Sequence, residues 1–246
     1  MTRAPWMAVI GLVACAAPAE RSLTADPGAE TTPVRPTHPS GIWPVTPPGA
    51  DSPDTPDPPG SATNCDPLHL VATDIDETLT TDNDEWDLQI DDPSYDPAMR
   101  PDANTLLQGY AARGYTIAYV TARWDFEMSD GRLASEHTVD WLHDHGFPLH
   151  GGLVFLAPEP DHDGDEVVEY KSGVLLGLQA EGWALDWAYG NAETDIEAFL
   201  LAGFPDDSTF LVGDRAGELE VPGIPNEDAY TAHLAHLASV PDVRCE

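Results

Sequence analysis

Residues 68–246 are predicted to fold as an α/β domain, in which a parallel sheet carries helices on both of its faces. Short apolar runs of strand length alternate along this region with longer amphipathic segments. Strand–helix alternation at this spacing is typical of a parallel sheet. Glycines follow four of the amphipathic segments at the position where a helix commonly ends, and these are Gly114, Gly146, Gly182 and Gly203.

The order of the predicted elements indicates where chemistry should occur. Strands are predicted over residues 69–73, 115–120, 152–156, 183–189 and 209–212. Helices are predicted over residues 103–113, 133–145, 168–180, 194–202 and 227–238. Segment 81–101 is too short for a full cap domain, so we expect it to form a small lid or rim. Ligands of such sheets bind beyond the carboxyl ends of the strands, so the residues after each strand are the candidates for function.

The N-terminal segment is predicted to direct export. An apolar run over residues 4–14 is too short to span a bilayer but suits a signal peptide. Residues 12–15, Leu-Val-Ala-Cys, resemble the lipobox of bacterial lipoproteins, which implies removal of residues 1–14 and lipidation of Cys15. The alternative is an ordinary signal peptide cleaved further on. We expect a protein of the bacterial cell envelope, held to a membrane by a lipid anchor in the first case.

The flanks of the predicted domain carry a spacer and two cysteines. Residues 15–67 are predicted to be a disordered tether, because 13 of the 24 prolines lie there among few apolar residues. Cys65 and Cys245 stand at the two ends of the domain. In an oxidising compartment they are expected to form a disulfide, since domain termini often lie close together. Two free thiols are the alternative.

The composition excludes several classes of protein. Ten basic and 44 acidic residues give a net charge of −34. A chain this acidic repels phosphate backbones and anionic lipid, which excludes nucleic-acid binding by charge neutralisation and docking through a basic patch. A hydrophobic content of 41% excludes disorder over the whole length. Nine of the ten basic residues are arginine, and Lys171 is the single lysine.

The first predicted strand is followed by Asp-Ile-Asp-Glu-Thr, residues 74–78. Two carboxylates directly after a buried strand would be costly if they were purely structural. A calcium-binding EF-hand loop is excluded, because a strand precedes the motif and Leu79 occupies the position that requires glycine.

The strand-end motif Asp-x-Asp-x-Thr resembles that of the haloacid dehalogenase (HAD) phosphotransferase superfamily. Thr121 follows the second strand, Lys171 precedes the fourth, and Asn191 and Asp195 follow the fourth, in the order of the remaining motifs of that superfamily. This resemblance implies a Rossmann-like HAD fold with a minimal cap, and Mg²⁺ as the cofactor. It also implies that a lysine neutralises charge between the nucleophile and the phosphoryl group.

Longer stretches narrow the resemblance to one family. Val-Thr-Ala-Arg at 120–123, Glu-Tyr-Lys at 169–171 and Gly-Asn-x-x-Thr-Asp at 190–195 are similar to the C-terminal catalytic domain of the lipin-type phosphatidate phosphatases. The resemblance covers roughly residues 68–220. It implies Mg²⁺-dependent removal of phosphate from phosphatidate to give diacylglycerol.

Carried over to this chain, the resemblance implies that Asp74 is the nucleophile and Asp76 the general acid and base. Thr121 and Lys171 would bind the phosphoryl group. Arg123, close to Thr121, is a candidate for contacting the substrate head group. Mg²⁺ would be held by the Asp74 carboxylate, the Asp76 backbone carbonyl, and oxygens of Asn191 and Asp195, directly or through water.

One departure from the lipin pattern keeps other functions open. Glu77 stands where the lipins have glycine, and Asp-Ile-Asp-Glu-Thr is also similar to the secreted HAD acid phosphatases. We predict a monomeric phosphomonoester hydrolase acting on phosphatidate or a related phospholipid. The alternatives are a broad-specificity envelope acid phosphatase or nucleotidase, and a non-catalytic phosphatidate-binding domain of the kind that phosphatidylinositol transfer proteins carry.

Overall fold

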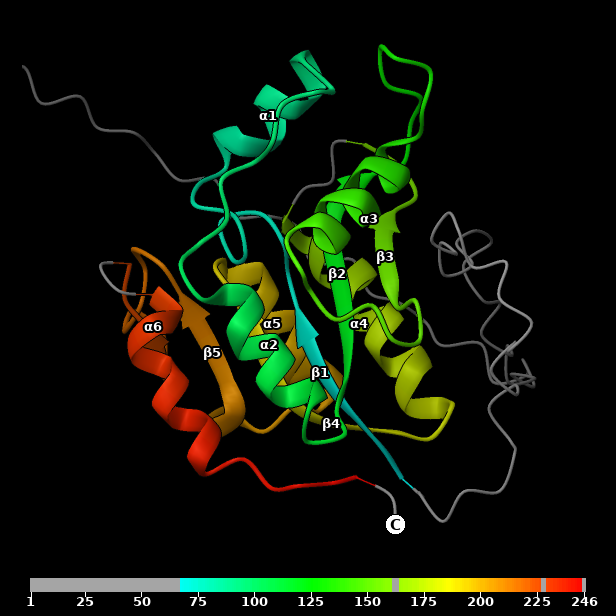
Figure 1. The fold of residues 1–246 in the computed structure, drawn as a ribbon. Coiled ribbons are helices and arrows are strands. Elements are labelled where there is room, and N and C mark those ends of the chain that lie inside the picture. The colour runs from blue at the N-terminus through cyan, green and yellow to red at the C-terminus, as the bar shows by residue number, and fades with distance from the viewer. Residues whose placement is uncertain (1–66, 161–163, 227–228, 245–246) are drawn as a thin grey trace, which may run out of the picture. The chain divides into compact units, whose positions relative to one another are not determined.

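A computed structural model describes residues 67–160, 164–226 and 229–244. Cys15, Cys65, Cys245 and the predicted signal peptide lie outside the described residues, as does all but the last residue of the predicted tether. Six described strands form one sheet (Figure 1): β1 (Leu68–Thr73), β2 (Thr116–Trp124), β3 (Val154–Ala157), β4 (Trp183–Gly190), β5 (Thr209–Val212) and β6 (Gly223–Ile224). Every pairing is parallel, in the order β3-β2-β1-β4-β5-β6.

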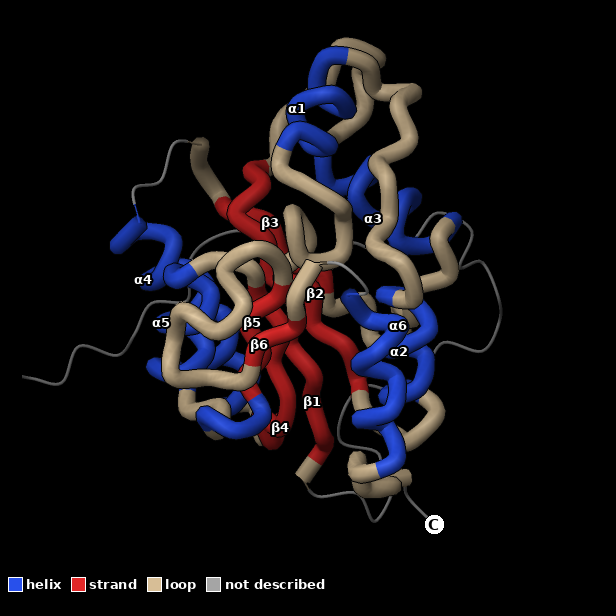
Figure 2. The backbone as a smooth tube through the Cα atoms, turned by 90° about the vertical axis from the view of Figure 1, so that its left-hand side faces the viewer, coloured by secondary structure: helices blue, strands red, loops and turns tan. Residues whose placement is uncertain are grey.

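Helices cover both faces of this sheet, which confirms the predicted α/β class. They are α1 (Asp84–Asp91), α2 (Ala103–Ala111), α3 (Ala134–Asp144), α4 (Gly164–Ala180), α5 (Glu193–Ala202) and α6 (Ala229–His233), followed by the 3₁₀ helix Leu234–Ala238. Figure 2 shows α4 and α5 on one side of the strands, and α2 and α6 on the other. Within the described part of the chain, no helix combines the length and the apolar character needed to cross a bilayer.

Side chains of the central strands alternate between two cores, because successive residues of a strand point to opposite faces. Val71 of β1 belongs to a cluster with Leu106 and Tyr110 of α2. Leu70, one residue earlier, belongs to the cluster on the α4 and α5 side. The buried members of this cluster from the two helices are Leu175 and Leu178 of α4, and Ile196, Phe199 and Ala202 of α5.

The strand order determines where the functional loops meet. The chain runs from β1 outward through β2 to β3, and then crosses to the other side of β1 to form β4, β5 and β6. A ligand site in such a sheet lies beyond the carboxyl ends of the strands, where the order reverses. Here this is the point between β1 and β4, so the segments 74–80 and 190–195 are brought to the same edge of the sheet.

The predicted elements agree with the structure except in three places. All five predicted strands are present, and the four predicted helix-ending glycines have φ values between 73° and 102°, as a left-handed cap requires. Strand β6 and helix α1 were not predicted. The last helix was predicted as one continuous helix over 227–238, but its described part changes from α6 to a 3₁₀ helix at Leu234, a tightening that is common at helix ends.

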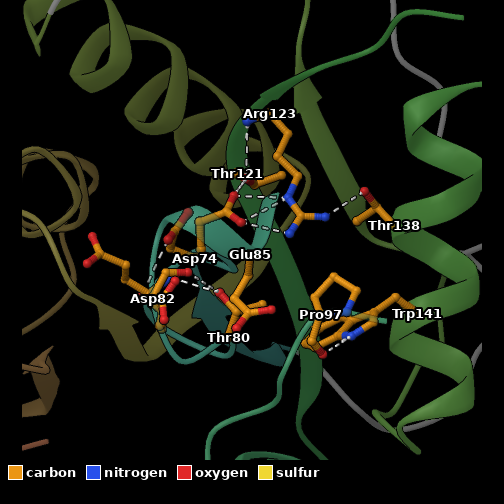
Figure 3. A network of polar contacts seen from close by, with 12 residues as sticks. Asp74, Thr80, Asp82, Glu85, Pro97, Thr121, Arg123, Thr138 and Trp141 are labelled. Carbon is orange, nitrogen blue, oxygen red and sulfur yellow. Dashed lines mark hydrogen bonds and ion pairs between the residues drawn. The ribbon is translucent and has the colours of Figure 1, made fainter. Parts of the chain in front are cut away.

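The segment between β1 and α2 forms the small lid that was expected in place of a cap domain. It contains α1, which stands beyond the carboxyl ends of the central strands in Figure 1. The buried Glu85 carboxylate holds the two ends of the lid together. It accepts hydrogen bonds from Thr81 Oγ1 at 3.0 Å, and from the Tyr95 hydroxyl and the Ala98 backbone N–H at 2.8 Å. Trp141 Nε1 of α3 donates to the Pro97 carbonyl oxygen at 2.9 Å (Figure 3).

We expect the α5 face to decide much of the stability of the domain. Ile196→Ala should lower the free energy of unfolding by about 2–5 kcal/mol, because Ile196 is buried in the core and truncating its side chain leaves a cavity. The matched control on the same helix is Leu201→Ala, where the side chain is 60% exposed and the expected change is within about 0.5 kcal/mol. Urea unfolding measures both, and equal losses in the two variants would contradict the assignment of the buried face.

Candidate active site

Asp74 directly follows the central strand, at the start of a tight turn. Its backbone N–H donates to the Tyr189 carbonyl oxygen of β4 at 2.9 Å, which extends the sheet pairing by one residue. The Ile75 carbonyl oxygen then accepts hydrogen bonds from the backbone N–H groups of Thr78, Leu79 and Thr80. Ile75 is fully buried, so the turn is anchored in the core and the Asp74 carboxylate is held at the edge of the sheet.

The single lysine of the chain lies between two carboxylates at this edge. Lys171 Nζ, from α4, is 2.6 Å from Asp74 Oδ1 and 2.5 Å from Asp195 Oδ1 of α5. All three residues are at most 4% exposed. Buried charges require a paired and hydrogen-bonded partner, and here one ammonium serves both carboxylates. The lysine therefore joins α4, α5 and the turn after β1.

Burial shifts the proton affinities of this group. It raises the pKa of the Asp74 carboxyl to about 7; Lys171 opposes the shift, while the charges of Asp195 and Asp76 add to it. Burial alone would lower the pKa of the Lys171 ammonium, but the two carboxylates outweigh it and raise that pKa above its ordinary value. Lys171 therefore stays charged at neutral pH, whereas the negative charge on Asp74 is only partly compensated.

Asp195 also shapes the turn after β4. Its Oδ2 accepts hydrogen bonds from the backbone N–H groups of Asn191 and Ala192, both at 3.1 Å. The turn depends on glycine at position 190, because a Cβ there would lie 2.4 Å from the Asp195 Cβ. Both oxygens of Asp195 thus already accept hydrogen bonds, and its direct ligation of a metal ion stays a prediction.

The side chains of Asn191 and Thr78 complete the nucleophile's surroundings. Thr78 Oγ1 lies 3.3 Å from Asp74 Oδ2 and 3.2 Å from Asn191 Oδ1. The other end of the Asn191 amide, Nδ2, donates to Glu77 Oε2 at 2.9 Å. A hydroxyl has one proton to donate, so it cannot satisfy both of the oxygens that converge on it. Asp74 Oδ2 and Asn191 Oδ1 therefore converge on one hydroxyl that can donate to only one of them at a time.

Asp76 is held by an arginine on the neighbouring strand. Arg123 Nη2 is 2.7 Å from Asp76 Oδ1, and Arg123 Nε is 2.9 Å from Asp76 Oδ2, which makes the pair bidentate. Arg123 Nη1 also donates to Thr138 Oγ1 of α3 at 3.2 Å, and the guanidinium carbon stands 4.2 Å above the Trp86 ring of α1. In Figure 3 the guanidinium group of Arg123 lies between Thr121 and Thr138.

The structure brings every predicted site residue of the domain to one edge of the sheet. Thr121 lies beside the second carboxylate, with its Oγ1 3.3 Å from Asp76 Oδ2. The Arg123 side chain points toward Asp76 and is fully buried against it, and not toward a substrate head group as predicted. To contact a head group it would have to leave its ion pair with Asp76. Among the residues described, no three His, Cys, Asp or Glu side chains gather as a metal site on their own, so the predicted ligand set depends on the Asn191 amide.

Three contributors were not identified from the sequence. Thr78 carries a signal, since it is the last residue of the Asp-x-Asp-x-Thr motif. Trp86 carries only the weak signal of an aromatic residue in a polar segment. Glu77 carries none for its contact with Asn191, because the two residues are far apart in sequence and meet only when β1 and β4 pair.

A cavity of about 300 Å³ opens beside these residues. Glu77 and Asn191 form part of its wall, together with Asp82, Arg100 and Arg215. Arg100 is 5% exposed and its Nε donates to the Glu77 carbonyl oxygen at 2.9 Å. Of the predicted site residues of the domain, Asn191 lines this cavity, whereas Asp74, Asp76, Thr121 and Lys171 do not.

Known proteins resemble this chain over its central part. Membrane-associated phosphatidylinositol transfer protein 3 of Mus musculus and that of Homo sapiens are each 29% identical over 143 residues, which cover 58% of this chain and 13% of the relative. Membrane-associated phosphatidylinositol transfer protein 1 of Rattus norvegicus is 28% identical over 142 residues, covering 58% and 10%. This chain therefore spans only about an eighth or less of the length of these relatives.

Two solved structures are similar to part of this chain at low sequence identity. A protein of Mesorhizobium loti described as a HAD-like phosphatase has a TM-score of 0.45 and 18% identity, over 70% of this chain and 85% of that one. DsGPDH of Dunaliella salina has a TM-score of 0.39 and 17% identity, over 61% and 24%. The model of one protein family matches residues 71–213, which is more than half of the 246 residues. The chain therefore belongs to the family described as PITM 1-3, LNS2 domain.

Proposed function

We propose that this chain is a Mg²⁺-dependent phosphomonoester hydrolase that acts through an aspartyl-phosphate, with phosphatidate or a related phospholipid as its substrate. The observation that carries the proposal is the pairing of the two carboxylates with different cations. Asp74 is buried against Lys171 at 2.6 Å, and Asp76, two residues later, is held by Arg123 at 2.7 Å. Two carboxylates in unlike surroundings can take the separate roles of nucleophile and proton carrier.

In the first step the Asp74 carboxylate attacks phosphorus and forms an acyl-phosphate bond. The bond between phosphorus and the ester oxygen breaks, and Asp76 gives its proton to that leaving oxygen. In the second step Asp76 takes a proton from water, whose oxygen attacks phosphorus and releases inorganic phosphate and the free Asp74 carboxylate. Lys171 holds Asp74 in place and neutralises negative charge beside the phosphoryl group, and the Thr121 hydroxyl can donate to a phosphoryl oxygen.

The residues present fit a bound Mg²⁺ ion. Two cations, Lys171 and Arg123, face three carboxyl groups, those of Asp74, Asp76 and Asp195, so one negative charge is left over in the state in which all three are ionised and Asp76 has yet to take up its catalytic proton. Asp74 Oδ2 and Asn191 Oδ1 converge on one hydroxyl, so they offer two oxygen atoms as ligands for a metal ion. Oxygen is the ligand type that Mg²⁺ prefers. Asp74, the Asp76 carbonyl, Asn191 and Asp195 would hold the ion, which would supply positive charge next to the transferred phosphoryl group.

Two observations and one untested sequence prediction favour a phospholipid substrate. The relatives' names describe membrane-associated phosphatidylinositol transfer proteins. The lid contains a single short helix, α1, which leaves room for a bulky ester. The predicted lipidation at Cys15 and the tether over 15–67 would keep an exported domain close to a membrane surface, so we extend the proposal to a lipid-anchored envelope enzyme.

The nucleophile is tested by Asp74→Asn. Phosphate release from phosphatidate micelles in Mg²⁺ should fall by roughly 10³-fold or more, because the amide cannot form the acyl-phosphate. Binding to phosphatidate vesicles should change little. The control is Asp207→Asn, an exposed position just before the amino end of β5 and therefore at the edge of the parallel sheet opposite to the site, which should leave both properties unchanged.

The same assay separates the alternatives when wild-type protein is given nucleotides and sugar phosphates, with Mg²⁺ and with chelator. Turnover of soluble esters alone would support an acid phosphatase. Vesicle binding without turnover of any ester would support a non-catalytic lipid-binding domain. Full turnover by Asp74→Asn would contradict the mechanism.

Asp74→Asn should also stabilise the protein in the presence of chelator. Burial raises the pKa of Asp74 from 3.8 to about 7, so ionising this group opposes folding as pH rises from about 4 to 7. The variant should therefore match the wild type near pH 4 and exceed its free energy of unfolding by on the order of 2–4 kcal/mol at pH 8. Denaturant unfolding at the two pH values measures the difference. A variant less stable than the wild type at pH 8 would refute the proposed charge surplus.

Salt should improve the apparent affinity for an anionic substrate. The net charge of −34 repels such a substrate, and added salt screens this repulsion. For a soluble phosphomonoester at constant Mg²⁺, we expect KM to fall about twofold or more as ionic strength rises from about 20 to 200 mM. Initial-rate kinetics over this range check the expectation, and a KM that rises steadily with salt would speak against it.

A further inference from the structure

We propose that Glu77 is a positioning residue for the metal ion, because its carboxylate fixes the orientation of the Asn191 side-chain amide. The inference deepens the proposed function, since it concerns the same Mg²⁺ site. It assigns a role to the residue at which this chain departs from the glycine of the lipin pattern. Glu77 itself need not touch the ion or the substrate.

The backbone at Glu77 is the first observation. Its φ is +55°, and in the described ranges Asp102 is the only other non-glycine residue with a positive φ. A residue with a Cβ adopts the left-handed conformation at a cost that glycine does not bear. A glutamate at this position therefore indicates that its side chain contributes something that glycine cannot.

The contact of its side chain shows what that contribution is. Glu77 Oε2 accepts a hydrogen bond from Asn191 Nδ2 at 2.9 Å. An amide has a donor end and an acceptor end, so holding Nδ2 on Glu77 turns Oδ1 toward the opposite side. There Oδ1 lies 3.2 Å from the Thr78 hydroxyl, which is itself 3.3 Å from Asp74 Oδ2. Glu77 thus presents an amide oxygen beside the nucleophile.

The reversed amide would have the opposite effect on a cation. With its ends exchanged, Asn191 would direct an N–H group toward the Thr78 hydroxyl oxygen, and the hydroxyl proton would then be free to donate to Asp74 Oδ2. That would satisfy the carboxylate with a hydrogen bond and would place a donor where a ligand oxygen is needed. A carboxylate at position 77 disfavours the reversed amide. The Glu77 carboxylate oxygen and the Asn191 amide oxygen would then lie next to each other, and neither of them has a proton to donate.

The main chain of Glu77 is held on both sides, so its side chain has a defined starting point. Thr80 Oγ1 accepts the hydrogen bond of the Glu77 N–H at 3.0 Å. The buried Arg100 donates from Nε to the Glu77 carbonyl oxygen at 2.9 Å. Substitutions of the side chain at position 77 should therefore leave the turn in place.

The test is the titration of the full-length chain with MgCl₂ in a calorimeter, without substrate. Glu77→Gly should weaken Mg²⁺ binding by about tenfold, the lower end of the usual effect of residues that orient metal ligands. Glu77→Gln should bind within about twofold of the wild type, because its amide oxygen can still accept from Asn191 Nδ2. Asp102→Gly, which relieves the other positive φ, should bind Mg²⁺ as the wild type does.

A second comparison shows whether Glu77 acts through Asn191. In an Asn191→Ala background, Glu77→Gly should cause no further loss of Mg²⁺ affinity, because the amide that it orients is gone. Thermal unfolding of each variant checks the fold, and Glu77→Gly should be at least as stable as the wild type.

Three results would overturn the inference while leaving the proposed function intact. They are wild-type affinity in Glu77→Gly, equal losses in Glu77→Gly and Glu77→Gln, and a full additional loss in the Asn191→Ala background. A wild-type chain that does not bind Mg²⁺ would instead refute the metal-dependent function itself.

Discussion

The bridge from Lys171 to Asp74 and Asp195 is the interaction on which the site depends. Each partner comes from a different element, and their distances of 2.6 and 2.5 Å leave no room for water between them. Such buried ion pairs add little net stability, because desolvation offsets most of the attraction, yet removing one partner leaves an uncompensated charge. The bridge thus acts chiefly as a constraint on geometry. It sets where the nucleophile lies relative to α4 and to the turn after β4.

A second constraint connects the lid to the proton carrier. Trp86 of α1 stacks on the Arg123 guanidinium, and Arg123 holds Asp76. Cation–π contacts of a desolvated guanidinium contribute about 2 kcal/mol, comparable with a hydrogen bond to a charged group. The lid is therefore not only a rim around the entrance. Its packing bears directly on the carboxylate that is proposed to transfer protons.

Much of the fold follows from local patterns in the sequence, and the exceptions have physical reasons. The five main strands are apolar runs that both cores bury, and the glycines that end the helices need a left-handed backbone. Strand β6 has two residues, too few for a periodicity to be recognised. Half of the residues of helix α1 are acidic, and its one buried aromatic ring packs on Arg123 as well as on the core.

In the candidate site, too, some features could be predicted from the sequence and others could not. The positions of Asp74 and Asn191 directly after β1 and β4 could be predicted, because parallel strands bring their carboxyl ends together. Thr121 was predicted to follow β2 but lies within it, because this strand continues to Trp124. The direction of Arg123 could not be predicted, since it depends on Asp76 and Trp86, which lie on other segments. Nor could the contact between Glu77 and Asn191, which are 114 residues apart. Sequence indicates which residues gather, whereas side-chain direction depends on neighbours that only the folded chain supplies.

The burial of the single lysine has a practical consequence for chemical labelling. Apart from its α-amino group, the chain has one primary amine, which belongs to Lys171; this residue is 2% exposed, and its amine is paired with two carboxylates. An amine-directed acylating reagent needs a free, uncharged nitrogen, so it can react at Lys171 only when the bridge has opened. The rate of lysine acylation is thus a direct measure of how often this buried centre becomes exposed to solvent.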